Sequence, residues 1–268
     1  LEDVRRDRTV YREGHFRAID GPHRAVSGRL REEGHDLVEQ ILDALHRKGV
    51  LDETAIIVSA DHGESQGELN IYGDHQTADH TCCRVPLLIA WPGIPGGRVD
   101  RALHYQVDMA ATIVELTGGR VPELWDGRSF APAFRDGVEA GRDYLVVSQM
   151  AWSCQRGIRW GDWMALRTYH DGLKDLAPEM LFNLAEDPHE TRNLATERPE
   201  VMDHGLALLE RWHTEMLLSS PEPVDPLWTV LREGGPFHTR GRLHAYCAYL
   251  RETGRAHHAD ALLARHAE

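Results

Sequence analysis

The chain has 268 residues, of which 41% are hydrophobic and 27% are charged, a composition typical of a globular protein with one large domain or a domain plus a small one. Its formal net charge of −13 argues against nucleic acid or an anionic membrane as a partner. No apolar run reaches transmembrane length, and no signal-peptide core opens the chain. Because the first residue is Leu1 rather than Met, the sequence leaves export open, and the cytoplasm is slightly favoured; the oligomeric state also stays open.

The four cysteines have neither the spacing of a zinc site nor the even framework of a small secreted domain. We expect reduced and mostly buried thiols at these positions, which are Cys82, Cys83, Cys154 and Cys247.

The first elements predict an α/β fold. Between Glu32 and Lys48, apolar residues recur at the helical spacing of i, i+3, i+4 and i+7, and Gly49 is suited to end that helix. Residues 55–60 then form a short continuous apolar run, which is typical of a strand buried on both faces. In doubly wound sheets, ligands bind beyond the carboxyl ends of such strands, where Asp61 and His62 follow here.

A polar loop over residues 65–84 leads to a second predicted buried strand, residues 85–90. Pro86 must lie at the start of this strand, because proline cannot donate within a central ladder. A helix is expected from Met109 to Thr117, capped by Asp108 and stopped by Gly118.

From about Asp143 the pattern changes to short strands, which predict a small antiparallel sheet with a helix packed on it. The hairpin of this sheet should turn at Gly161-Asp162. The expected strands are residues 144–148, 156–160, 163–167 and 180–184, the helix is 199–218, and further helical pieces lie at 246–250 and 259–265.

Asp61 and His62 are the strongest chemical signal, since a carboxylate and an imidazole at a strand end are good ligands for a divalent metal. The alternative is a polar strand end in which Asp61 caps the next turn. His75 and His80 follow within a short span and could supply ligands, an acid or an anion clamp. The alternative for each of them is a solvated loop residue.

Several segments in consistent order resemble the second half of sulfatases, in the alkaline phosphatase superfamily. The resemblance is carried by Ile57–Glu64, Arg84–Ile89, Trp91–Gly93, Tyr105–Thr112, Asp126–Ser129 and Leu181–Ala195. It implies an alkaline-phosphatase-like α/β sandwich with a C-terminal antiparallel subdomain. We therefore expect part of the α/β catalytic domain in residues 1–140, the antiparallel subdomain in 141–220 and a helical extension in 221–268.

The resemblance also implies roles for individual residues. Asp61 and His62 match the pair that coordinates the catalytic divalent cation, usually calcium, with magnesium or manganese as alternatives. His75 stands where the family has a sulfate-binding lysine, a departure that replaces a permanent cation by a group that titrates near neutrality. We expect it to be catalytic and to bind substrate. His80 resembles a metal ligand of the two-metal branch, and His23 has a weak likeness to a histidine that contacts the ester.

The nucleophile of the family is absent from this sequence. It arises as formylglycine from a Cys/Ser-x-Pro-x-Arg motif, and no cysteine here has that context. The expected function is hydrolysis of the sulfate monoester of a small molecule or glycan, with the nucleophile in a missing N-terminal half. A phosphomonoesterase or phosphodiesterase of the same superfamily and a non-catalytic fragment are the alternatives, and we expect this fragment alone to be inactive.

Overall fold

The computed structural model describes residues 22–266, with side chains from residue 34 onward. The chain divides into two compact units: residues 1–56 with 90–93, and residues 57–89 with 94–268. The three-part division at residues 140 and 220 stays a prediction. Among the described residues, no helix combines the length and the apolar character needed to cross a membrane.

The first unit contains the long helix α2 (Pro22–Arg47) and the 3-10 turn η2 (Leu51–Glu53). The predicted helix is confirmed, but it begins at Pro22 rather than at Glu32. Proline suits this start because its fixed φ and missing N–H are tolerated in the first helical turn. Gly49 ends the helix as expected, with a φ of 70° and its amide donating to the His46 carbonyl at 2.9 Å.

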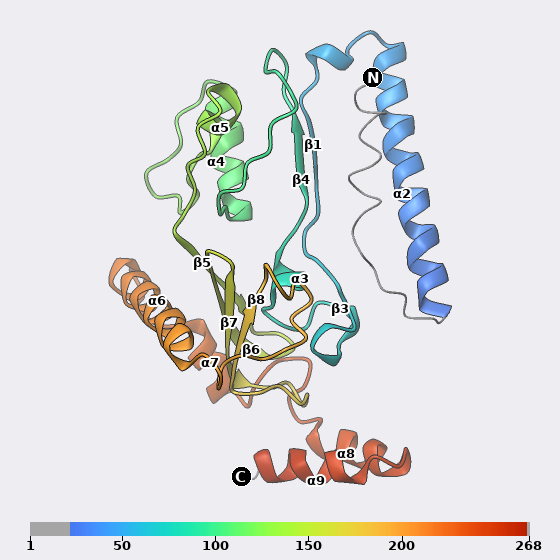
Figure 1. The fold of residues 1–268 in the computed structure, drawn as a ribbon, viewed down its shortest axis with the longest axis vertical. Coiled ribbons are helices and arrows are strands. Elements are labelled where there is room, and N and C mark those ends of the chain that lie inside the picture. The colour runs from blue at the N-terminus through green and yellow to red at the C-terminus, as the bar shows by residue number, and fades with distance from the viewer. Residues whose placement is uncertain (1–21, 267–268) are drawn as a thin grey trace. The chain divides into compact units, whose positions relative to one another are not determined.

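Strands β1 (Ile56–Ser59) and β4 (Leu87–Ala90) pair with each other in a two-stranded sheet (Figure 1). Both predicted strands are thus confirmed, with Pro86 just before the second. Their predicted burial is wrong, because Leu87 and Leu88 are 41% and 48% exposed. A strand is buried on both faces only where other elements cover both faces, and a pair of strands lacks that cover.

The segment predicted as a polar loop is structured. It contains β2 (Ser65–Gln66), the turn η3 (Glu68–Asn70), β3 (Tyr72–Asp74) and the short helix α3 (His80–Cys83). Strands β2 and β3 pair antiparallel. Asp79 begins α3 by accepting the Cys82 amide at 3.2 Å.

Helix α4 (Gln106–Leu116) starts before the predicted Met109, so Asp108 lies inside its first turn instead of at the N-cap. Asp108 still stabilises the helix start, because its carboxylate accepts the Tyr105 amide at 2.7 Å. This buried carboxylate also pairs with Arg142 at 2.8 Å. The short helix α5 (Ala131–Arg135) follows.

The predicted antiparallel sheet is confirmed. Its four strands are β5 (Tyr144–Gln149), β6 (Cys154–Trp160), β7 (Trp163–His170) and β8 (Glu179–Asn183), in that order across the sheet. Trp160 pairs with Trp163 across the turn, where Gly161 has a φ of 45°.

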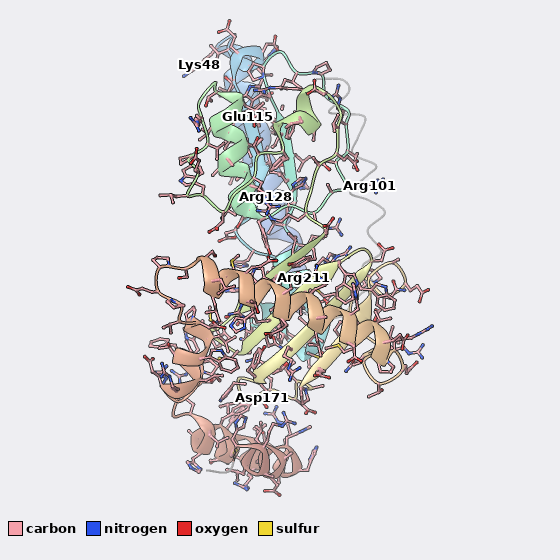
Figure 2. The ribbon with its side chains drawn as sticks, turned by 90° about the vertical axis from the view of Figure 1, so that its left-hand side faces the viewer. Lys48, Arg101, Glu115, Arg128, Asp171 and Arg211 are labelled. Carbon is pink, nitrogen blue, oxygen red and sulfur yellow. The ribbon has the colours of Figure 1, made fainter. Side chains whose placement is uncertain are left out.

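The two faces of this sheet pack against different partners, because successive side chains of a strand point to opposite faces. Figure 2 shows helix α6 (Pro199–Ser219) lying across one face, where Met202 and Leu209 join a buried cluster with Ile158. On the other face, Ala78 packs with Met164. The 75–78 segment therefore rests on the face opposite to α6.

Three further helices complete the chain: α7 (Pro226–Arg232), α8 (Leu243–Glu252) and α9 (Ala256–Arg265). The last two confirm the predicted helical pieces, whereas α7 was not among those pieces. A buried ion pair of 2.7 Å between Arg156 and Asp225 ties the start of α7 to the sheet. Arg265 at the end of α9 pairs with Asp171 at 2.6 Å.

The cysteine prediction is confirmed. All four thiols are free, and all are buried except that of Cys83. Burial raises the pKa of Cys82 to about 12, so this thiol stays protonated and unreactive at neutral pH.

Candidate active site

Asp61 and His62 directly follow β1 and face the same space. The Asp61 side chain is 88% exposed, and its Oδ2 lies 3.8 Å from His62 Nε2. The His62 amide donates to Asp61 Oδ1 at 3.0 Å, and this hydrogen bond is the main reason that the pKa of the Asp61 carboxyl is lowered. Asp61 therefore presents an ionised oxygen at the surface.

The His62 ring has one nitrogen already engaged. Its Nδ1 lies 2.8 Å from the Gly63 carbonyl oxygen, so a proton on Nδ1 donates to that oxygen. In this tautomer Nε2 carries the free lone pair and points toward the side of Asp61. The pair Asp61 Oδ2 and His62 Nε2 thus has the donor chemistry that a divalent cation needs.

Gly63 links the Asp61-His62 pair to the segment before β4. Its amide donates to the Cys82 carbonyl at 2.8 Å. A Cβ at this position would collide with the Thr81 carbonyl oxygen, so the close approach requires glycine.

His75 meets the motif from a different segment. Its ring stacks on that of His62, with centroids 3.8 Å apart and an angle of 27° between the planes. Asp74 orients His75, since its Oδ1 accepts the His75 amide at 2.7 Å and lies 3.5 Å from Nδ1. Gln149 of β5 donates to the His75 carbonyl at 2.9 Å. The structure therefore brings together three of the predicted site residues, and the role of each stays a prediction.

His80 is placed differently. Its imidazole is largely buried, and burial, with Arg84 and Arg159 acting in the same direction, lowers its pKa to about 4. Its amide donates to the Glu190 carboxyl at 3.1 Å. Within the described part of the chain, no contact joins the His80 ring to Asp61, His62 or His75. The second-metal role of His80 stays a prediction without a partner in this arrangement.

Glu190 is a residue that the sequence analysis did not single out. Its buried carboxyl accepts the amides of His80 and Thr81 at the start of α3. Burial, followed by the neighbouring Asp79 carboxylate, raises the pKa of Glu190 to about 8. In the sequence, Glu190 lies in the segment Asp187–Glu190, which contributed only to the family resemblance and indicated no role for this carboxyl group.

The last candidate, His23, falls in helix α2, but its side chain lies outside the described residues. The described residues contain no group of three or more His, Cys, Asp or Glu side chains that could hold a metal ion. Asp61 and His62 are two donors, so they would form part of a coordination shell rather than a whole one.

Comparisons with known proteins match this chain to one family. The family model described as "Sulfatase" matches residues 8–119, and the model for the C-terminal part of N-sulphoglucosamine sulphohydrolase matches residues 67–211. A choline-sulfatase from Rhizobium meliloti is 33% identical over 59% of this chain and 30% of its own length.

Two solved structures share the fold. One is described as a complex with its substrate D-glucosamine-2-N,6-O-disulfate, and it matches with a TM-score of 0.60 and 24% identity over 69% of this chain and 39% of its own. The other is a phosphonate monoester hydrolase from Silicibacter pomeroyi, with a TM-score of 0.56 and 24% identity over 68% of this chain and 38% of its own.

The chain covers only part of the length of each of these proteins. The chain spans 30% of the choline-sulfatase and about two-fifths of each of the two solved structures. The second family model alone covers more than half of the chain, and the segments that it matches include His75, His80 and Glu190. The chain belongs to the sulfatase family and has the mixed α/β architecture of its alkaline-phosphatase-like fold.

Proposed function

We propose that this chain supplies part of the active site of an enzyme that hydrolyses sulfate monoesters, turning ROSO3⁻ and water into an alcohol and hydrogen sulfate. The observation that carries the proposal is the stack of His62 on His75 beside the exposed Asp61 carboxylate, within segments that match sulfatase models. Such hydrolysis resembles phosphoryl transfer, in which positioning and charge stabilisation provide most of the catalysis.

Asp61 Oδ2 and His62 Nε2 would hold a divalent cation, for which calcium is our first expectation and magnesium or manganese are alternatives. When bound, the cation supplies positive charge that stabilises the sulfuryl oxygens and favours the ionised form of a nucleophile. Two donors fill only part of the six to eight positions around calcium, most of which take oxygens, so residues outside this chain would complete the shell. We expect weak binding of the cation by these 268 residues alone.

His75 would contact the transferred group. Its Nδ1 faces Asp74, so Nε2 is the nitrogen that would donate to a sulfuryl oxygen or to the leaving oxygen. A hydrogen bond of this charge-assisted kind contributes about 1.5–3 kcal/mol. We therefore expect His75→Gln to lower kcat/KM by roughly one to two orders of magnitude.

The nucleophile would be a formylglycine in a segment outside these 268 residues. The substrate class that we propose is a sulfated small molecule or glycan, in line with the disulfated glucosamine bound by a protein of the same fold. The similarity to a choline-sulfatase supports a sulfated small molecule as the other possible substrate.

The test uses the full-length protein with 4-nitrophenyl sulfate and 4-nitrophenyl phosphate, in the presence of calcium, magnesium or manganese. We expect metal-dependent release of sulfate that is lost in Asp61→Asn. Asp52→Asn, which neutralises an exposed carboxylate away from the motif, should keep full activity.

Other outcomes would select the alternatives. A preference for the phosphate ester would favour a phosphoesterase. We include this alternative because a phosphonate monoester hydrolase shares the fold. Absence of turnover with either ester and every metal would favour a non-catalytic role. Turnover by the 268-residue chain alone would contradict the proposed location of the nucleophile.

A further inference from the structure

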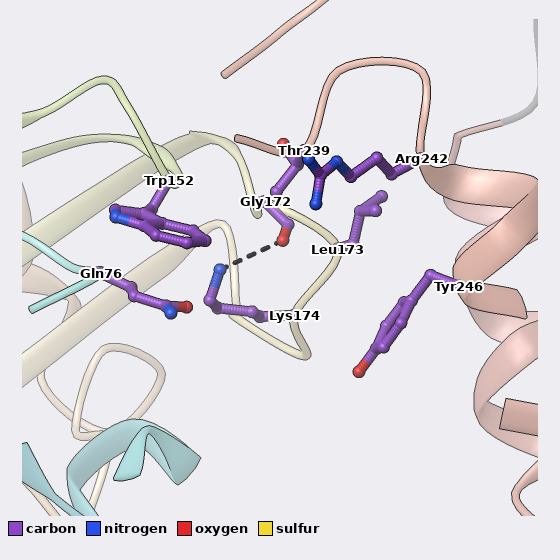
Figure 3. A pocket seen from close by; sticks show the side chains of 8 residues that line it. All are labelled: Gln76, Trp152, Gly172, Leu173, Lys174, Thr239, Arg242 and Tyr246. Atoms are coloured by element: carbon purple, nitrogen blue, oxygen red, sulfur yellow. Dashed lines mark hydrogen bonds between the residues drawn. The ribbon is translucent and has the colours of Figure 1, made fainter. Parts of the chain in front are cut away.

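A small pocket lies next to the candidate active site. It has a volume of about 220 Å³, and Gln76, Trp152, Lys174, Thr239, Arg242 and Tyr246 are among its lining residues (Figure 3). Pockets that hold whole ligands usually measure about 300–1,000 Å³. This cavity is therefore suited to one group of a ligand rather than to a whole oligosaccharide.

Gln76 connects the pocket to the proposed catalytic group. It directly follows His75, so their α-carbons lie about 3.8 Å apart. The Gln76 side chain donates to Asp74, and Ser153 Oγ donates to its carbonyl at 2.9 Å. A residue that lines the pocket therefore directly follows His75 in the chain and is held by these two hydrogen bonds.

Lys174 provides an incompletely satisfied cation in this pocket. Its ammonium donates to the Gly172 carbonyl at 3.1 Å and lies 5.9 Å from the centre of the Trp152 ring. An ammonium has three donors, and the other two have no hydrogen-bond or ion-pair partner among the described residues. Burial lowers the pKa of Lys174 to about 8, although Asp171 and Asp74 act in the opposite direction. A bound anion would offset that cost of burial.

Arg242 provides the second cation. It is exposed, and within residues 34–266 no hydrogen bond or ion pair engages its guanidinium. Figure 3 shows Arg242 extending toward Thr239 and Gly172 on the side of the pocket where Tyr246 also lies, with the Lys174 ammonium on the other side, next to Trp152.

The acids nearest to Lys174 have other partners. Asp171 pairs with Arg265 at 2.6 Å and with His266 at 2.8 Å. Asp74 accepts from His75 and Gln76. Lys174 and Arg242 thus line one cavity, and among the described residues no carboxylate forms an ion pair with either of them, in a protein whose net charge is −13.

We propose that this pocket is a subsite for a second oxyanion of the substrate, a carboxylate or a further sulfate, which Lys174 and Arg242 bind while the scissile sulfate lies at His75. The proposal rests on the proposed sulfatase function and narrows its substrate to molecules with two anionic groups. Lys174 would donate its two free N–H groups, and the Arg242 guanidinium would donate from the other side.

The experiment compares two substrates in the full-length protein: glucosamine 6-O-sulfate and glucosamine 2-N,6-O-disulfate. We expect wild type to prefer the disulfate. Lys174→Met and Arg242→Gln should each lower kcat/KM for the disulfate about tenfold or more, and should change kcat/KM for the monosulfate less than about twofold.

Arg251→Gln is the control, because it also removes one arginine charge, from the helix α8 that Arg242 precedes, and lies outside the pocket. Arg242→Gln keeps the test valid if Lys174→Met fails to fold, since Arg242 is exposed. Equal losses on both substrates, or no loss on the disulfate, would overturn the subsite.

Failure of the proposed function would look different. If wild type hydrolyses neither sugar, sulfatase activity on these sugars is refuted, and the subsite is judged by calorimetric binding of the disulfate. Binding that weakens about tenfold in both pocket variants and not in Arg251→Gln would still support the subsite. Binding that is absent, or equal in all variants, would refute it.

Discussion

The β5–β8 sheet and the β1–β4 pair are both built from apolar strands, yet their surroundings differ. In the four-stranded sheet, Ile158 and Leu166 are fully buried, because α6 covers one face and the 75–78 segment covers the other. In the pair, Leu87 and Leu88 are 41% and 48% exposed. An apolar run therefore predicts a strand reliably, whereas its burial depends on elements far away in the sequence.

The exposed pair also bears on the complete protein. The chain spans less than half of the length of each relative described above, and strands this apolar are a liability at a free surface. We expect segments outside this chain to cover β1 and β4 in the complete protein, and the isolated chain to aggregate or to associate with such a segment.

The largest expected difference between the two regions comes from truncating one apolar side chain in each. Phe182 is 1% exposed in β8, so Phe182→Ala should lower the free energy of unfolding by about 3–5 kcal/mol. Leu88→Ala in β4 should cost less than about 1 kcal/mol in the 268-residue chain, because much of that side chain is already in water. Urea unfolding followed by circular dichroism measures both values.

The same substitution sharpens the comparison in the full-length protein. There, Leu88→Ala should cost about 2–5 kcal/mol if β4 is covered. A cost that stays below 1 kcal/mol in the long protein would mean that β4 remains exposed.

Gly157 tests how tightly the 75–78 segment lies on the sheet. A Cβ on Gly157 would collide with the Ala78 carbonyl oxygen and lie 2.6 Å from Met164 Cε. Gly157→Ala should therefore destabilise the chain by about 1–3 kcal/mol through overpacking. Gly96→Ala is the control, because a Cβ there meets no atom within 4 Å. Equal melting temperatures for the two variants would contradict the close packing.

Glu190 gives a pH-dependent difference. The unfolded chain releases the Glu190 proton near pH 4.5, whereas the folded chain keeps it up to about pH 8. The wild type thus loses stability as pH rises through this window. Glu190→Gln cannot ionise, so its Tm relative to wild type should increase by several degrees between pH 5 and pH 8. Glu186→Gln changes an exposed residue of the same segment and should show no such trend; a flat difference for both would refute the buried acid.

His80 should give a smaller effect of the opposite pH sense. Its pKa falls from 6.5 to about 4 on folding, so the unfolded chain binds a proton in this window and the folded chain does not. The wild type therefore loses stability as pH falls from 6.5 toward 4. His80→Gln should lose less over that range, by a few degrees in Tm at most. Scans of the exposed His244→Gln variant provide the reference, and parallel curves for the two variants would contradict the burial of His80.

Local patterns predicted most of the fold. The hairpin at Gly161 and helix α6 follow from alternation, turn residues and helical spacing within a few residues of each position. Helix α7 was missed although its start carries local signals, since Asp225 accepts the Leu227 amide at 2.9 Å and Pro226 opens the helix. The exposure of β4 was missed for a different reason, since the sequence does not record which strands lie beside it.

The candidate site likewise contains residues that local patterns predicted and one residue that they did not. Asp61 and His62 stood out by their position after a strand, and His75 by standing where the family has a lysine; the structure brings the three side chains together. Glu190 could not be found by spacing, because its contact with His80 spans 110 residues. Long-range polar contacts of this kind leave no local pattern.

The contact between Glu190 and the start of α3 has a consequence for folding during synthesis. The backbone after Asp61 is held by Cys82, and the helix containing Cys82 begins at amides held by Glu190. Domains fold during synthesis from the N-terminus, and contacts between distant segments close late. A ribosome must therefore deliver residue 190 before the geometry around Asp61 is complete. Chains stalled or truncated short of that point would carry every proposed ligand of the cation and still lack the arrangement that presents them.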